Sequence, residues 1–180
     1  MDKIIQEASR IQSCYGAKDL DSVAHALGMA IYDVLESEHV KEVYFPALQA
    51  VALRPDLPRH ERRYLIAHAL GHHVLHRAHK ARDYIGMHAP LPEEASDEQR
   101  AEISRAESEA ELFAAYLLIP ESQLCSALRQ GWVKRSKDPV TDLAVELRVP
   151  PEAVRARLVF EKCRRLQRQE IDQALGQEAQ

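Results

Sequence analysis

Cysteine, glycine and tryptophan are all scarce in this sequence. Its 180 residues include three cysteines, six glycines and one tryptophan. The cysteines, Cys14, Cys125 and Cys163, lie far apart and form no CxxC pair. This spacing argues against a cysteine–zinc knuckle and against a dense disulfide framework, and it fits a reducing compartment. We therefore expect a cytoplasmic protein.

Long apolar runs and an excess of basic residues are also missing. Residues 1–7 contain no apolar segment of the kind found in a signal peptide. The longest notable apolar run, residues 112–119, is much shorter than the roughly 20 residues that span a bilayer. The formal net charge of −4 argues against binding to nucleic acid, which usually needs a basic surface. The length suits one compact domain. The short apolar runs give no reason to expect membrane attachment.

The N-terminal part predicts two helices followed by a strand region. Apolar residues recur at helical spacing in residues 1–15, which predicts the first helix. The second is expected to begin at a cap, Asp19 or Asp21, and to continue through Ile31. Residues 43–53 form the only convincing strand region, because β-branched and aromatic residues are followed there by an alternating pattern.

Prolines and capping residues mark the later helices. A helix is expected over residues 58–80, because proline suits its first position, and residues 82–95 are interpreted as a loop. Ser96 and Gln99 form a capping-box pattern that begins a long helix ending before Pro120. Three further helices are predicted, over residues 121–129, 139–149 and 151–170. The fold class is therefore α+β and predominantly helical.

Histidine is concentrated in one predicted helix. Five of the nine histidines lie within twelve residues, at His68, His72, His73, His76 and His79. His68 and His72 are four residues apart, so they share a helical face about one turn apart. Two imidazoles in this arrangement can bind one zinc ion. The spacing alone is a weak signal, and we expect His73 and His79 to lie on the helix surface.

One residue between these histidines departs from the usual zinc-peptidase motif. HExxH peptidases use the glutamate after the first histidine as a general base. The sequence here is His68-Ala69-Leu70-Gly71-His72, so both metal-binding histidines are present and the base is replaced by Ala69. No neighbour is an obvious substitute, because His73 lies on the wrong flank and Glu61 is two turns away.

A carboxylate-rich segment lies downstream in the predicted long helix. Glu107 and Glu111 share a helical face, while Glu109 points elsewhere. The residues that follow are strongly apolar. Carboxylates next to such a core need an ion pair, a metal ion or a position at its rim. A solvated acidic face is the alternative, and the spacing leaves both interpretations open.

Three segments carry a resemblance to a known family. They are residues 62–76 (RRYLIAHALGHHVLH), 107–120 (ESEAELFAAYLLIP) and 143–158 (LAVELRVPPEAVRARL). In this order they resemble the ImmA/IrrE metallopeptidases over roughly residues 20–160. The resemblance implies a minimal zincin-like fold with a small sheet, an active-site helix and C-terminal helices. We expect the metallopeptidase domain in residues 1–120 and a helical extension packed on the same domain in residues 121–180.

The resemblance also implies roles for individual residues. His68, His72 and Glu107 would bind Zn2+. Glu111, which occupies an Asn or Asp position of the family, would orient His68. His76 has a claim to a place near the site because it lies one turn beyond His72. The family includes peptidases that cleave helix-turn-helix repressors, so such a repressor is the expected partner.

The alanine at position 69 leaves two interpretations of function. General-base catalysis typically contributes about 10²–10⁴-fold to rate, so we expect a zinc endopeptidase that is inactive as written. Ala69 is then either an introduced inactivating change or a natural feature of a pseudoprotease that sequesters a regulator. The first is favoured because the rest of the motif, including Gly71 and His76, is intact.

A third interpretation is a DNA-binding regulator. The predicted helices on either side of Pro150 and Pro151 have the order of a helix-turn-helix motif, and the second offers Arg155 and Arg157. Apolar residues in both helices are typical of packing against a core, and the chain is acidic overall. Both features argue against direct DNA binding.

Overall fold

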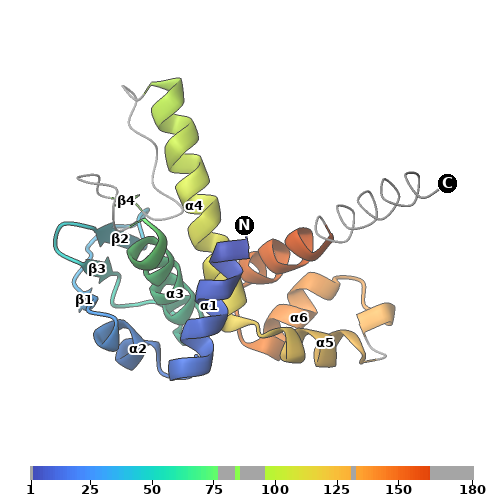
Figure 1. Cartoon of the computed structure of the whole chain (residues 1–180). Coiled ribbons are helices and arrows are strands. Elements are labelled where there is room, and N and C mark those ends of the chain that lie inside the picture. Colours follow the sequence, from blue (N-terminus) through green and yellow to red (C-terminus); the bar gives the residue numbers. More distant parts are fainter. Residues whose placement is uncertain (1, 77–83, 86–95, 131–132, 163–180) are drawn as a thin grey trace.

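Helices dominate the computed structural model, which describes residues 2–76, 84–85, 96–130 and 133–162 (Figure 1). The helices are α1 (Asp2–Tyr15), α2 (Leu20–Ala26), α3 (Arg59–Leu75), α4 (Asp97–Leu118), α5 (Glu121–Leu128) and α6 (Pro139–Leu147), with a short 3-10 helix η1 (Val133–Arg135) and a further helix over residues 151–162. The strands are β1 (Ala30–Asp33), β2 (Glu42–Phe45), β3 (Ala50–Leu53) and β4 (Tyr84–Ile85). The predicted α+β, predominantly helical class is confirmed.

The four strands form one mixed sheet in the order β1-β3-β2-β4. β1 runs parallel to β3, and β2 is antiparallel to both β3 and β4. The predicted strand region 43–53 is therefore a hairpin rather than one strand. Residues 46–49 turn the chain, and Gln49 has a positive φ of 50°. This backbone conformation is uncommon outside glycine, so the sequence gives little warning of the turn.

The second predicted helix is wrong in its last part. α2 ends at Ala26 and the chain continues into strand β1 from Ala30. Gly28 has a φ of 82°, and the amide of Met29 donates to the carbonyl of Ala24 at 2.8 Å. This is the hydrogen-bond pattern of a glycine-terminated helix. Ala30 and Ile31, which suggested a longer helix, belong to strand β1.

Most predicted helix boundaries near the site are confirmed. α3 begins after Pro58, and α4 begins at a capping box in which Ser96 and Gln99 bond reciprocally. The predicted loop 82–95 lies mostly outside the described residues, and its described pair, Tyr84–Ile85, is strand rather than loop. Residues 77–80 and 163–170 of the predicted helices also lie outside the described residues.

The two central helices, α3 and α4, pack closely against each other. A Cβ atom on Gly71 of α3 would lie only 2.9 Å from the Cα atom of Ala110 of α4. Real Cβ atoms do not approach backbone atoms so closely, so a glycine is needed at this crossing. α3 contacts strands β2 and β3 with another face, while α1 packs along α4. The site described below lies where α3 meets α4.

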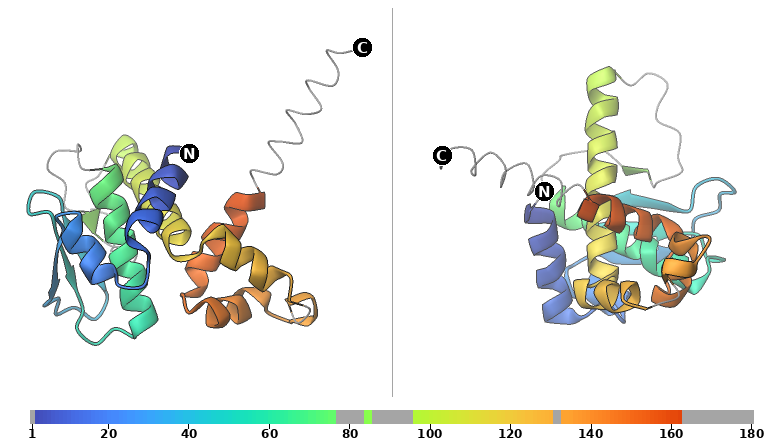
Figure 2. Two further views of the ribbon diagram at one scale, coloured as in Figure 1. Left: turned by 60° about the horizontal axis from the view of Figure 1, so that its bottom comes forward. Right: turned by 90° about the vertical axis from the view of Figure 1, so that its right-hand side faces the viewer.

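The C-terminal helices lie across α4 from the sheet (Figure 2). One buried apolar cluster includes residues from both predicted parts of the chain, from Ile4 to Phe160. The division into residues 1–120 and 121–180 remains a prediction. Among the described helices, none combines the length and the apolar character that crossing a bilayer requires.

Candidate metal centre

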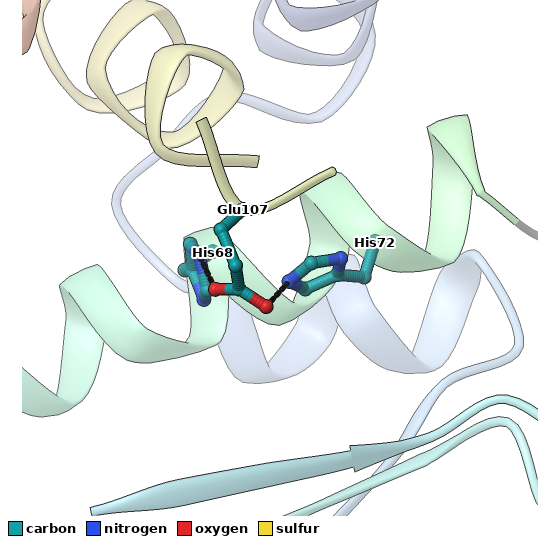
Figure 3. A group of neighbouring side chains, drawn as sticks. All are labelled: His68, His72 and Glu107. Atoms are coloured by element: carbon teal, nitrogen blue, oxygen red, sulfur yellow. Dashed lines mark ion pairs between the residues drawn. The ribbon is translucent and has the colours of Figure 1, made fainter. Parts of the chain in front are cut away.

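Two helices bring His68, His72 and Glu107 together. The two histidines lie on α3 and face Glu107 of α4 (Figure 3). Nε2 of His68 is 3.4 Å from Oε2 of Glu107, and Nε2 of His72 is 3.4 Å from Oε1 of the same carboxylate. The possible ligand atoms all lie within 4.8 Å of one another. Both histidines are buried, and the Glu107 side chain is 18% exposed.

The arrangement of these atoms suits coordination of a metal ion better than direct hydrogen bonds between the three side chains. A separation of 3.4 Å is longer than the roughly 2.7–2.9 Å of a charge-assisted hydrogen bond. Nε2 of His68 and both oxygens of Glu107 are buried and make no hydrogen bond with any residue in the described ranges. Buried polar atoms without partners are costly. Two imidazoles and one glutamate are also a donor set that catalytic zinc sites use.

The charge states of the three side chains reflect burial and mutual contact. Burial lowers the pKa of His72 to about 4, which keeps it in the neutral form that binds metals. Burial also opposes a charge on His68, but Glu42 and Glu107 outweigh it and raise its pKa to about 10. Burial alone would raise the pKa of Glu107, yet both histidines lower it to about 2. Glu107 is therefore ionised at neutral pH.

Glu42, the first residue of β2, holds His68 from the other edge of its ring. Oε1 of Glu42 accepts the hydrogen bond of Nδ1–H of His68, and both side chains are buried. This contact turns Nε2 toward Glu107 and keeps a proton on Nδ1. The sequence assigned the support of His68 to Glu111. That assignment stays a prediction, and the structure adds Glu42 as the partner of Nδ1, while Nε2 faces Glu107.

His72 is supported through a second histidine. Its Nδ1 atom lies 3.1 Å from Nδ1 of His76, and Nε2 of His76 lies 3.0 Å from Oε2 of Glu109. If Nε2 of His72 is kept free of a proton, its Nδ1–H donates to His76, whose Nε2–H donates to Glu109. The structure thus places His76 beside the site. Glu109, which the sequence directs elsewhere, ends this chain of contacts.

His73 is buried, which contradicts its predicted place on the helix surface. The hydroxyl of Tyr44 donates to its Nδ1 at 2.8 Å, and its Nε2–H donates to the carbonyl of Leu27 at 3.0 Å. The ring of Tyr44 also stacks on His72, with centroids 6.1 Å apart. His73 therefore ties α3 to β2 and to the end of α2. His79 lies outside the described residues.

Neither His73 nor Glu61, which the sequence analysis weighed, nor the newly found Glu42 replaces the missing base. Ala69 has no accessible surface. His73 is bound as described, and Glu61 forms an ion pair with Lys41. Glu42 engages the Nδ1 edge of the first histidine, away from the Nε2 edge that faces Glu107. None of the three side chains occupies the place of a glutamate at position 69.

The buried state of Arg157 weakens the helix-turn-helix interpretation. Its guanidinium lies 3.6 Å above the ring of Tyr116 and pairs with Glu161. The side chain is fully buried, so it cannot reach a DNA groove. Arg155 is exposed and pairs with Glu152 at 3.7 Å. One of the two arginines considered for DNA contact is thus a packing residue.

The fold and the His–His–Glu group together are those of a metallopeptidase-like domain. The family model of the IrrE N-terminal-like domain, peptidase family M78, matches residues 23–159. Because this match covers more than half of the chain, the protein belongs to that metallopeptidase family, and the predicted membership is confirmed. No curated protein matches the chain in sequence.

Glu42→Gln is expected to weaken zinc binding by about 10–100-fold, the usual cost of losing a residue that supports a ligand. Glutamine keeps the size of the side chain but removes the negative charge that favours the Nδ1–H tautomer of His68. Titration against a chromophoric chelator measures the change. Glu38→Gln, at an exposed position of the preceding loop, is the matched control. Equal affinity in both variants would mean that Glu42 does not orient the ligand.

Proposed function

We propose that the chain holds a zinc ion through His68, His72 and Glu107 and acts on a helix-turn-helix repressor or a similar regulatory protein. By family it would be an endopeptidase, inactive as written because Ala69 replaces the general base. One observation carries the proposal: buried, convergent ligand atoms of two histidines and one carboxylate. Zinc bound there would supply a Lewis acid that polarises a peptide carbonyl and the attacking water.

Several residues of the chain orient the proposed metal ligands, whereas Ala69 cannot act as a general base. Glu42 orients His68, and the His76–Glu109 pair orients His72. Each fixes the ring so that Nε2 faces the shared centre. Ala69 has no titratable group, so it can neither accept a proton from water nor deliver one to the leaving amine. The site therefore supports binding of metal and of a peptide without efficient cleavage.

A second candidate function is a non-catalytic zinc-binding pseudoprotease that sequesters its regulator. The burial of Ala69 favours this candidate. In an enzyme, the general base must reach the reacting water, so its position is expected to face the substrate. An alanine without accessible surface fits a position that makes no contact with the reacting water. Both candidates share the same metal residues and the same class of partner.

The cytoplasm remains the proposed location, supported by the sparse and widely spaced cysteines. Regulation of transcription is likewise part of the proposal, since it depends on the identity of the partner. Direct binding to DNA is not part of it, because Arg157 is buried and the chain is acidic. Any effect on genes would therefore act through the bound repressor.

The test mixes the zinc-loaded chain with a candidate helix-turn-helix repressor from the same locus. We expect a complex on size-exclusion chromatography, with the repressor still intact by mass spectrometry. His72→Ala loaded under the same conditions is the control, and should bind the repressor more weakly if the metal site forms part of the interface. Cleavage by the chain as written would contradict the inactive state. Absence of any complex would remove the repressor from the proposal.

A further inference from the structure

A cavity away from the candidate metal centre is lined mainly by cationic side chains. It has a volume of about 660 Å³ and lies between the start of α3 and the end of α6. Four cationic side chains line it, those of Lys18, Arg59, Arg63 and Arg148, together with the imidazole of His60. No acidic side chain of the described residues lines it. This is unusual for a chain with a net charge of −4.

The cations of this cavity form few ion pairs, although Glu146 lines an adjoining hollow that shares Lys18, Arg63 and Arg148. Lys18, Arg59 and Arg148 form no ion pair with any carboxylate in the described ranges. Arg63 donates to a backbone carbonyl, that of Ala17, at 2.7 Å. Its Nε atom is buried and makes no hydrogen bond with a described residue. Burial of Nε without a partner adds to the cost of the Arg63 charge, which an anion at the other guanidinium nitrogens would offset.

The adjacent arginine shows the contrast. Arg62 precedes Arg63 on α3 and binds two carboxylates, those of Asp21 and Asp33, at 2.9 and 3.2 Å. Burial and the nearby charge of Arg59 both lower the pKa of Arg63. Like charges gathered in a concave surface repel each other and concentrate anions. An anion in the cavity would relieve this repulsion.

The shape and lining of the cavity indicate a small molecule. Its volume falls within the range of about 300–1,000 Å³ that is typical of small-molecule sites. Guanidinium groups match the oxygens of a phosphate with paired hydrogen bonds. The wall contributed by α6 is apolar and includes Val145, which is 74% exposed. An exposed apolar side chain beside several cations suits a ligand with one apolar and one anionic part.

We propose that this cavity binds a small organic phosphate, with the phosphate against Arg59, Arg63 and Arg148 and the apolar part against Val145. The site is separate from the metal centre, although α3 carries residues of both. The proposal does not depend on zinc binding or on the class of protein partner. A long acidic protein segment fits less well, because the concave lining is compact and partly apolar.

Isothermal titration of the full chain with three probes tests the proposal. Adenosine monophosphate should bind, and inorganic phosphate should bind more weakly because it lacks the apolar part. Adenosine should bind at least about ten-fold more weakly than its monophosphate, since hydrogen bonds to a charged group contribute about 1.5–3 kcal/mol. If neither phosphate probe binds, or if adenosine binds as well as its monophosphate, the proposal is overturned.

Single substitutions test whether the ligand binds in this cavity. Arg59→Gln should weaken binding of adenosine monophosphate by about ten-fold or more, because one charged contact is lost. Arg59 is exposed at the start of α3, so its replacement leaves the core unchanged. Arg155→Gln, at an exposed position outside the cavity, is the matched control and should bind normally. Equal weakening in both variants, or tighter binding of a hexaglutamate peptide than of the monophosphate, would overturn the assignment.

Discussion

Replacing Ala69 with glutamate is expected to raise the rate of peptide cleavage by the zinc-loaded chain by about 10²–10⁴-fold. Position 69 is one residue beyond His68 and three before His72. It is the place of the general base in HExxH peptidases. A carboxylate there would take a proton from the attacking water and later return it to the leaving amine. The other residues of the site remain as they are.

The burial of Ala69 makes the choice of control important. Ala69→Gln has almost the same volume as Ala69→Glu but cannot accept a proton at neutral pH. Both variants should retain zinc, and only the glutamate variant should cleave the repressor in a single-turnover assay. Equal rates for the two variants would show that position 69 does not act as a base. If both retain zinc and bind the repressor but neither cleaves it, the pseudoprotease candidate is favoured.

Local rules account for part of the candidate metal-binding group. The four-residue spacing of His68 and His72 depends only on helix geometry. The capping box at Ser96 fixes where α4 begins, and the phase of that helix follows from it. Gly71 and Ala110 then allow the two helices to approach closely. The sequence alone could not show this approach, and the family resemblance supplied the pairing with Glu107.

The contacts behind the histidines could not be predicted from local patterns. Glu42 lies 26 residues before His68 and meets it through the packing of β2 against α3. A glutamate at the start of a short strand normally indicates an exposed end. The only signal was that it immediately precedes the apolar segment 43–53. His73 was misplaced for a related reason, since its partners Tyr44 and Leu27 belong to other elements.

The errors in the sheet have a backbone origin. Gly28 and Gln49 both adopt positive φ angles, at the end of α2 and in the β2–β3 turn. Gly28 is a recognisable helix-ending signal. The apolar residues through Ile31 also fit a helical spacing, and this favoured a helix that continues past the glycine. Glutamine has no such preference, so the turn could not be located from composition. The hairpin matters for the site, because it is β2 that carries both Glu42 and Tyr44.

Glu107→Ala is expected to weaken zinc binding by more than about 100-fold, beyond the cost of losing a supporting residue. Among the described residues, Glu107 is the carboxylate whose two oxygens face the histidine Nε2 atoms, each at 3.4 Å. Its removal leaves two imidazoles and no negative charge among the proposed ligands. Alanine favours a helix, so α4 should remain folded. The loss is therefore expected in metal affinity rather than in secondary structure.

Glu111→Ala provides the matched comparison, one turn further along the same helix. It removes an equal charge from α4, and it should lower the affinity for zinc by less than Glu107→Ala does. Competition with a chromophoric chelator gives both affinities, and thermal melting with and without zinc gives a second readout. A bound ligand stabilises the native state in proportion to its affinity, so zinc should raise the melting temperature of Glu111→Ala more than that of Glu107→Ala. The reverse order would assign the metal to Glu111 and overturn the proposed ligand set.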